Sequence, residues 1–64
     1  MLTDLLPTTL EDEIICVKRE IAMREKVYPR WVASGKMKAH NAEYEIATMK
    51  SVLESLYRLK GLER

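Results

Sequence analysis

The chain has 64 residues, one cysteine and one histidine, and its formal net charge is +1. This length allows one small domain, and such a domain usually needs a disulfide, a bound metal or a partner chain for stability. A single cysteine and a single histidine exclude a disulfide framework and a zinc site, so self-association or binding to another protein is the favoured source of the missing stability.

Residues 1–7 are expected to form a short N-terminal arm, because Pro7 stops any helix that would run through it. The arm either frays or covers a neighbouring helix as an apolar strap. It carries Asp4 and no basic residue, which is unlike a signal peptide, and no apolar run approaches the roughly 18 residues of a membrane span. We therefore expect a cytoplasmic protein without membrane contact.

A helical hairpin is predicted over residues 8–61, with its first helix at about 9–33. Thr8 and Glu11 match the ends of a capping box, so the helix is expected to begin at Thr8 or Thr9. Apolar residues then recur at steps of three and four, as on one helix face. This stripe and its apolar flank contain Leu10, Ile14, Ile15, Cys16, Val17, Ile21, Ala22, Met23, Val27, Tyr28 and Trp31. One partner helix cannot cover so broad a face, which favours oligomerisation.

Arg24 interrupts the apolar stripe between Ile21 and Tyr28. A guanidinium in such a seam must reach an acid or a carbonyl, or else extend its stem along the seam and keep its charge in water. Glu20 lies one helical turn earlier and is the expected partner.

Pro29 falls near the end of the first helix and removes one backbone donor. Either the helix kinks at Pro29 and continues to about Ala33, or it stops at Tyr28 and a separate turn begins. The kink is favoured because Trp31 continues the helical stripe. Gly35 then suits the left-handed position that ends a helix. We expect Trp31 to point inward and Arg30 to point outward.

The second helix is predicted at about 39–60, followed by a tail at 62–64. Its apolar stripe contains Ala39, Ala42, Ile46, Met49, Leu53 and Leu56, and it is flanked by Val52 and Leu59. Gly61 is expected to end the helix. Glu54 is spaced four residues from both Lys50 and Arg58, so two surface ion pairs are predicted along this helix.

The expected fold is all-α: an antiparallel two-helix hairpin in which two helices of about 30 Å pack side by side. Two copies are expected to associate as a homodimer, forming a four-helix bundle with coiled-coil-like packing.

The sequence offers no equipment for catalysis, so we expect that the protein is not an enzyme and that it uses no metal and no cofactor. The hairpin places His40 beside the turn and Cys16 well down the first helix, where they should not meet. No glycine-rich phosphate loop is present.

Positive charge is concentrated in the middle of the chain, where residues 14–38 hold seven basic and two acidic side chains. These basic residues and the aromatic residues near them predict a partner-binding surface at the turn, which we call the corner surface. The corner surface consists of Arg24, Lys26, Tyr28, Arg30, Trp31, Lys36 and Met37. Alternatively, the cations only solubilise the protein and the aromatic residues cap the hairpin core. Nucleic acid is the less favoured partner, because the net charge is near zero.

The segment at residues 18–32, with Arg24-Glu25-Lys26-Val27-Tyr28-Pro29-Arg30-Trp31-Val32 as its most specific part, resembles short uncharacterised proteins encoded by bacteriophages and prophages. The likeness spans about residues 13–57. It implies a bacterial cytoplasm and an accessory role, and it assigns no binding residues. We therefore expect a non-enzymatic phage or prophage protein that binds and modulates a host or phage protein. The alternative is a small nucleic-acid-binding factor that uses residues 19–38.

Overall fold

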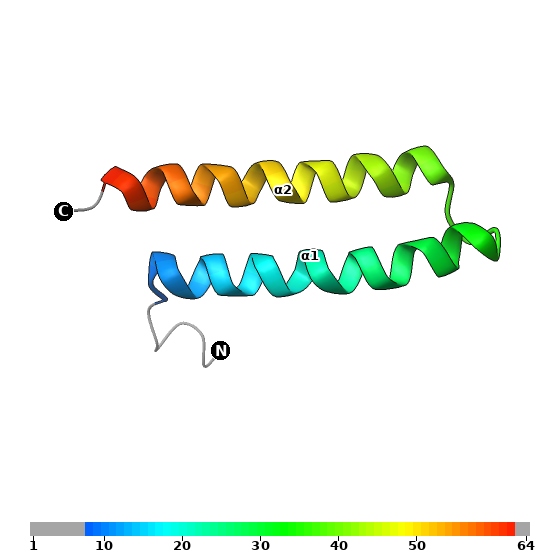
Figure 1. The fold of residues 1–64 in the computed structure, drawn as a ribbon, viewed down its shortest axis with the longest axis horizontal. Coiled ribbons are helices and arrows are strands. Elements are labelled where there is room, and N and C mark those ends of the chain that lie inside the picture. Colours follow the sequence, from blue (N-terminus) through cyan, green and yellow to red (C-terminus); the bar gives the residue numbers. More distant parts are fainter. Residues whose placement is uncertain (1–7, 63–64) are drawn as a thin grey trace.

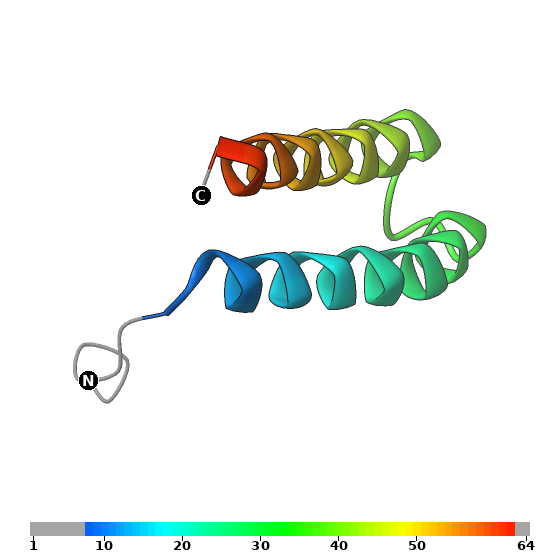
Figure 2. The ribbon, with the colours of Figure 1, turned by 60° about the vertical axis from the view of Figure 1, so that its left-hand side comes forward.

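The computed structural model describes residues 8–62, so the predicted arm at 1–7 and the last two residues of the predicted tail lie outside the described part. Helix α1 spans Leu10–Ala33 and helix α2 spans Ala39–Leu62, with 24 residues in each. The two helices run antiparallel and lie side by side over their whole length, joined by a short turn (Figures 1 and 2). The predicted all-α helical hairpin is confirmed.

Helix α1 begins with a capping box, one residue later than the pattern suggested. Thr9 is the N-cap: its hydroxyl accepts a hydrogen bond from the amide of Asp12, and the Asp12 carboxylate accepts one from the amide of Thr9, both at 3.1 Å. Each bond satisfies an amide that the first helical turn leaves without a partner. Glu11, the residue first expected to close the box, is thereby left to interact elsewhere.

Pro29 lies inside α1, and the helix continues through it to Ala33, as the kink hypothesis predicted. The axis of α1 changes direction over its last, green turns, close to this proline (Figure 1). A proline cannot donate to the carbonyl four residues before it and crowds that turn, which explains a bend at this place.

The turn begins where α1 ends, at the C-cap residue Ser34. Gly35 has φ 83°, the left-handed conformation expected for it. The carbonyl of Trp31 accepts hydrogen bonds from the backbone amides of Lys36, at 2.8 Å, and Met37, at 3.2 Å. These bonds close the turn in which the chain reverses direction. Left-handed backbone is readily adopted by glycine and strained for residues with a Cβ, so Gly35 allows this tight return.

Replacing Gly35 and Gly61 with alanine should change stability in opposite directions. A Cβ would meet nothing within 4 Å at either position, so backbone conformation alone decides the outcome. Gly35→Ala should cost about 1 kcal/mol because of its positive φ, whereas Gly61→Ala should gain about 0.5–1 kcal/mol in a helix. Thermal unfolding followed by circular dichroism measures both. Equal destabilisation by the two changes would contradict this assignment of the backbone.

Helix α2 starts without a Ser, Thr, Asp or Asn cap, and its first turn is anchored by the carbonyl of Lys38, which accepts from the amides of Asn41 and Ala42 at 3.1 Å. At the other end, Gly61 lies inside the helix, which runs on to Leu62. The prediction that Gly61 ends the second helix is therefore wrong. Gly61 has helical backbone, so its conformational freedom is not used.

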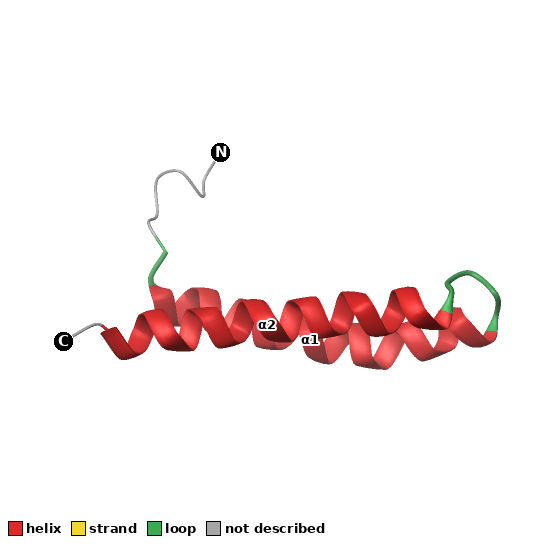
Figure 3. Cartoon of the chain, turned by 90° about the horizontal axis from the view of Figure 1, so that it is seen from above, coloured by secondary structure: helices red, strands yellow, loops and turns green. Residues whose placement is uncertain are grey.

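The core of the hairpin is small. Within residues 8–62 the buried apolar side chains are Ile14 and Ile21 of α1 and Ala42 of α2. The other seam positions are only half-buried, because the two helices form a single layer with solvent on both sides (Figure 3). These half-buried seam residues include Leu10, Val17, Tyr28, Val32, Ile46, Met49, Leu53 and Leu56. One layer cannot enclose the whole apolar stripe.

Two ion pairs link the helices across this seam. Lys50 Nζ lies 3.0 Å from Glu25 Oε2, and Lys60 Nζ lies 2.6 Å from Glu11 Oε2, at the open end of the hairpin. Lys50 therefore pairs across the seam with an acid of α1. Both ion pairs predicted for Glu54 are wrong, because Lys50 pairs with Glu25 and Arg58 donates to the hydroxyl of Ser55. Each exposed pair contributes about 0–1 kcal/mol, so these bonds set the register of the helices more than their stability.

Candidate partner-binding site

Three aromatic and basic residues of the corner surface meet on one side of α1. Arg24, Tyr28 and Trp31 line a shallow depression of about 250 Å³, together with Met23 and Val27. The spacing of three and four residues brings these side chains together along one helix. The rings of Tyr28 and Trp31 lie with their centroids 5.7 Å apart and their planes tilted by 30°, within the range of favourable aromatic pairs.

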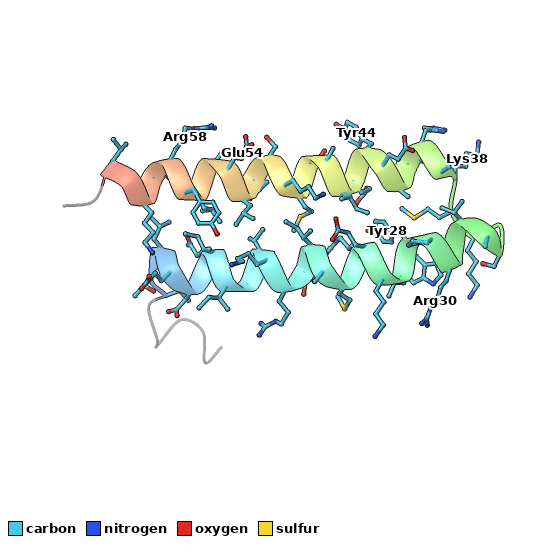
Figure 4. The ribbon with its side chains drawn as sticks, in the orientation of Figure 1. Tyr28, Arg30, Lys38, Tyr44, Glu54 and Arg58 are labelled. Atoms are coloured by element: carbon cyan, nitrogen blue, oxygen red, sulfur yellow. The ribbon has the colours of Figure 1, made fainter. Side chains whose placement is uncertain are left out.

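Trp31 does not point into the hairpin core, and the expectation that it faces inward is wrong. Its side chain is 42% exposed and rests against Tyr28 on the flank of α1. Tyr28 itself is half-buried and lies between the two helices (Figure 4). The inward position at this end of α1 is taken by Val32, which is half-buried. A large apolar ring is thus presented to solvent beside the turn.

Arg24 is held by Glu20, as the sequence predicted. Its Nη1 atom donates to the Glu20 carboxylate at 2.6 Å and to the Glu20 carbonyl at 3.3 Å. The hydrogen bond to Glu20 raises the pKa of the Arg24 guanidinium above its ordinary value, while burial acts in the opposite direction and Tyr28 adds to the increase. Arg24 therefore stays charged. Its Nε atom is buried and has no hydrogen-bond partner.

The other basic residues of the corner surface face solvent. Lys26, Arg30 and Lys36 are exposed, and Arg30 extends away from α2 (Figure 4), so Arg30 points outward as expected. Within residues 8–62, no acidic side chain forms an ion pair with Lys26, Arg30 or Lys36. These three charges are consequently available to a partner.

Met37 occupies a different position from the rest of the corner surface. Its side chain is half-buried, and its amide donates to the carbonyl of Trp31 as part of the turn. The structure thus separates the seven predicted residues into an aromatic depression with Arg24, a set of free cations, and a methionine that supports the turn.

No metal centre is formed by the described residues, which contain no group of three or more His, Cys, Asp or Glu side chains placed to hold an ion. Cys16 lies near the start of α1 and His40 in the first turn of α2, at the other end of the hairpin, and both are exposed. No helix of residues 8–62 has the length and apolar character that a membrane span requires.

Comparison with known proteins adds no relative. Models of protein families, curated proteins and solved structures were all compared with this chain, and none of them matches.

Two surface features escaped the sequence analysis. A second depression, of about 390 Å³, lies between the helices near the turn and is lined by Pro29 and Ala33 of α1 and by Ala39, Ala42 and Glu43 of α2, among others. The small residues at Ala33, Ala39 and Ala42 are the signal that could have revealed it, because they leave space where the helices meet. The second feature is a group of exposed apolar and aromatic side chains on α2, namely Tyr44, Val52, Tyr57, Leu59 and Leu62.

Proposed function

We propose that this protein is a non-catalytic interaction protein which acts as a homodimer and binds a protein partner through its corner surface. On the strength of the resemblance at residues 24–32, we assign it an accessory role in a phage or prophage, where it modulates a host or phage protein in the bacterial cytoplasm.

The observation that carries this proposal is an exposed indole at the end of α1, in a part of the hairpin that also carries free cations. Trp31 is 42% exposed, and Lys26 and Arg30, on the same helix, together with Lys36 in the turn, form no ion pair within residues 8–62. Tryptophan and arginine are enriched among the residues that contribute most to protein binding. Unpaired cations at the same end of the hairpin favour an acidic surface on the partner, since complementary charge increases the association rate and orients the two proteins.

The hairpin does not need these cations for its own stability. The ion pairs within residues 8–62 use Arg24, Lys50 and Lys60, which join Glu20, Glu25 and Glu11. Reversing the charge of Arg30 and Lys36 should therefore leave the fold intact, which makes these two positions suitable for a test of binding alone.

Arg30→Glu combined with Lys36→Glu should abolish capture of the protein partner. Tagged wild-type chain and tagged variant would be incubated with nuclease-treated bacterial lysate, and the retained proteins quantified by mass spectrometry. We expect a protein that wild type retains and that the variant loses by at least about tenfold.

A variant with Lys18→Glu and Arg58→Glu provides the matched control. It carries the same change in charge at two exposed positions outside the corner surface, and it should retain the partner as wild type does. Equal retention by all three chains, or equal loss from both variants, would contradict a partner site at the corner. Circular dichroism of each variant checks that helicity is unchanged.

Nucleic acid is the second candidate partner, because the free cations Arg19, Lys26 and Arg30 recur along one side of α1 near an exposed aromatic ring. Basic side chains contact phosphates and aromatic rings stack on bases. Fluorescence anisotropy with labelled DNA and RNA over a salt series tests this role. A nucleic-acid function requires binding at low salt that weakens as salt rises, and absence of binding at low salt would refute it.

A further inference from the structure

One side of the hairpin combines exposed apolar residues with the Glu20–Arg24 pair. Successive helical residues are rotated by about 100°, so Arg24 and Glu25 lie on opposite flanks of the inward stripe of α1. Glu25 pairs with Lys50 on one side of the hairpin, which assigns Arg24 to the other side. On α2, Val52 and Leu59 lie on the flank away from Lys50, and so on the side of Arg24. We call this side the Arg24 face. It presents Val17, Glu20, Arg24 and Val27 of α1 with Val52 and Leu59 of α2, and it ends at the bend near Pro29, so Trp31 lies beyond it (Figure 1).

The Arg24 face contains a polar group without a partner. Arg24 Nε is buried and makes no hydrogen bond, although the Nη1 atom of the same side chain is bonded to Glu20. A buried donor that lacks an acceptor costs free energy, and native proteins usually satisfy such groups. Glu20 has only Oε1 engaged by Arg24. The side chains of Arg24 and Glu20 are still 28% and 37% exposed, so Arg24 Nη2 and Glu20 Oε2 can bond a group outside the chain, which the buried Nε cannot reach.

The position of this pair along α1 makes the face complementary to itself. Helix α1 spans Leu10–Ala33, so its midpoint falls at Ile21 and Ala22, and Glu20 and Arg24 lie on either side of that midpoint. A two-fold axis through the midpoint would set two α1 helices antiparallel. Glu20 of each copy would then face Arg24 of the other, and Val17 would face Val27 of the other. A two-fold interface requires such self-complementarity.

We infer that a second copy of this chain packs on the Arg24 face, with α1 antiparallel to α1 of the copy and with Glu20 of each copy accepting hydrogen bonds from Arg24 of the other. This inference rests on the proposed homodimer and adds its interface. Two helices of about 36 Å, each about 10 Å wide, offer a face of about 700 Å², close to the roughly 800 Å² per partner of a standard interface. The dimer leaves Lys26, Arg30, Lys36 and Trp31 available to a protein partner, because all four lie outside the Arg24 face.

A charge-exchange experiment tests the pair across the interface. With Glu20→Arg, each copy brings two positive charges to the two-fold axis, at positions 20 and 24. With Arg24→Glu, each copy brings two negative charges to the same positions. Each variant alone should dimerise roughly tenfold or more weakly than wild type, because like charges face each other. A one-to-one mixture of the two variants should form a heterodimer, since every facing pair is then opposite in charge. Sedimentation equilibrium over a concentration series measures all three.

The mixture distinguishes contacts between copies from contacts within one helix. Neither variant has the internal Glu20–Arg24 pair, so a role confined to one chain predicts that mixing restores nothing. Arg30→Glu is the matched control: it changes charge equally on the outer surface of α1 and should leave dimerisation unchanged. Circular dichroism confirms that each variant remains helical.

Three outcomes would overturn the inference. If wild type is monomeric at tens of micromolar, both the homodimer and this interface fail. If wild type is dimeric and the two variants dimerise as well as it does, the homodimer stands and the interface is elsewhere. If the variants weaken dimerisation and the mixture does not restore it, the charges do not face each other across a two-fold axis.

Discussion

Replacing Ile14 with alanine should remove a large part of the protein's free energy of unfolding. Ile14 is 6% exposed and is one of only two buried isoleucines among the described residues. Truncating such a side chain typically costs about 2–5 kcal/mol. A domain of this length has a free energy of unfolding of about 3–10 kcal/mol, so the loss of one buried isoleucine side chain removes a large part of it. Urea unfolding followed by circular dichroism measures the loss.

The neighbouring residue supplies a closely matched control. Ile15 follows Ile14 in the same helix, has the same chemistry and helix propensity, and is 59% exposed. Ile15→Ala should change stability by no more than about 0.5 kcal/mol. Protein concentration must be identical in both experiments, because association would shift the apparent stability. Similar losses from the two variants would mean that Ile15 is covered in solution, which the single hairpin does not explain.

Replacing Ala42 with aspartate should destabilise the hairpin by about 3 kcal/mol or more relative to Ala47→Asp. Ala42 is the buried residue of α2, close to the turn, and its small side chain faces α1 together with Tyr28 and Val32. Ala42 is 7% exposed, and no basic residue lines the depression beside it, so a short carboxylate there would lose most of its contact with water without gaining an ion-pair partner.

Ala47→Asp controls for the low helix propensity of aspartate, because Ala47 lies in the same helix and is exposed. The difference between the two melting temperatures isolates burial. If both variants melted together, α2 would be rotated relative to its position in this structure, and Ala42 would not face α1.

The fold was predictable because each step depended on residues close in sequence. The apolar period of three and four predicted both helices, and Gly35 supplied the left-handed residue of the turn. The pairing of Arg24 with Glu20 followed in the same way, since residues four apart always face each other on a helix. Two helices joined by a short turn can only lie antiparallel.

The features that escaped prediction depend on how the helices are rotated against each other. Trp31 fits the period of the stripe, but rotation of α1 turns it to the flank, with Val32 inward instead. Lys50 had a partner of suitable spacing in Glu54, and in the structure it pairs with Glu25 across the seam. The cap was misplaced by one residue because Thr8 and Thr9 both suit an N-cap, and only three-dimensional geometry decides between them. Most residues of the corner surface lie near the turn, and Trp31 faces the flank of α1 instead of the core. Their role in binding a partner stays a prediction.

The short turn has a consequence for how the chain folds. Only residues 34–38 separate the two helices, so the entropy lost on closing this loop is small. Helix contacts nearest the turn join residues close together in the chain, whereas the Glu11–Lys60 pair joins residues 49 apart. A topology with such local contacts is typical of proteins that fold in microseconds to milliseconds. We expect the closure around Trp31 and Gly35 to come first, and the helices to pair from that end toward the chain termini.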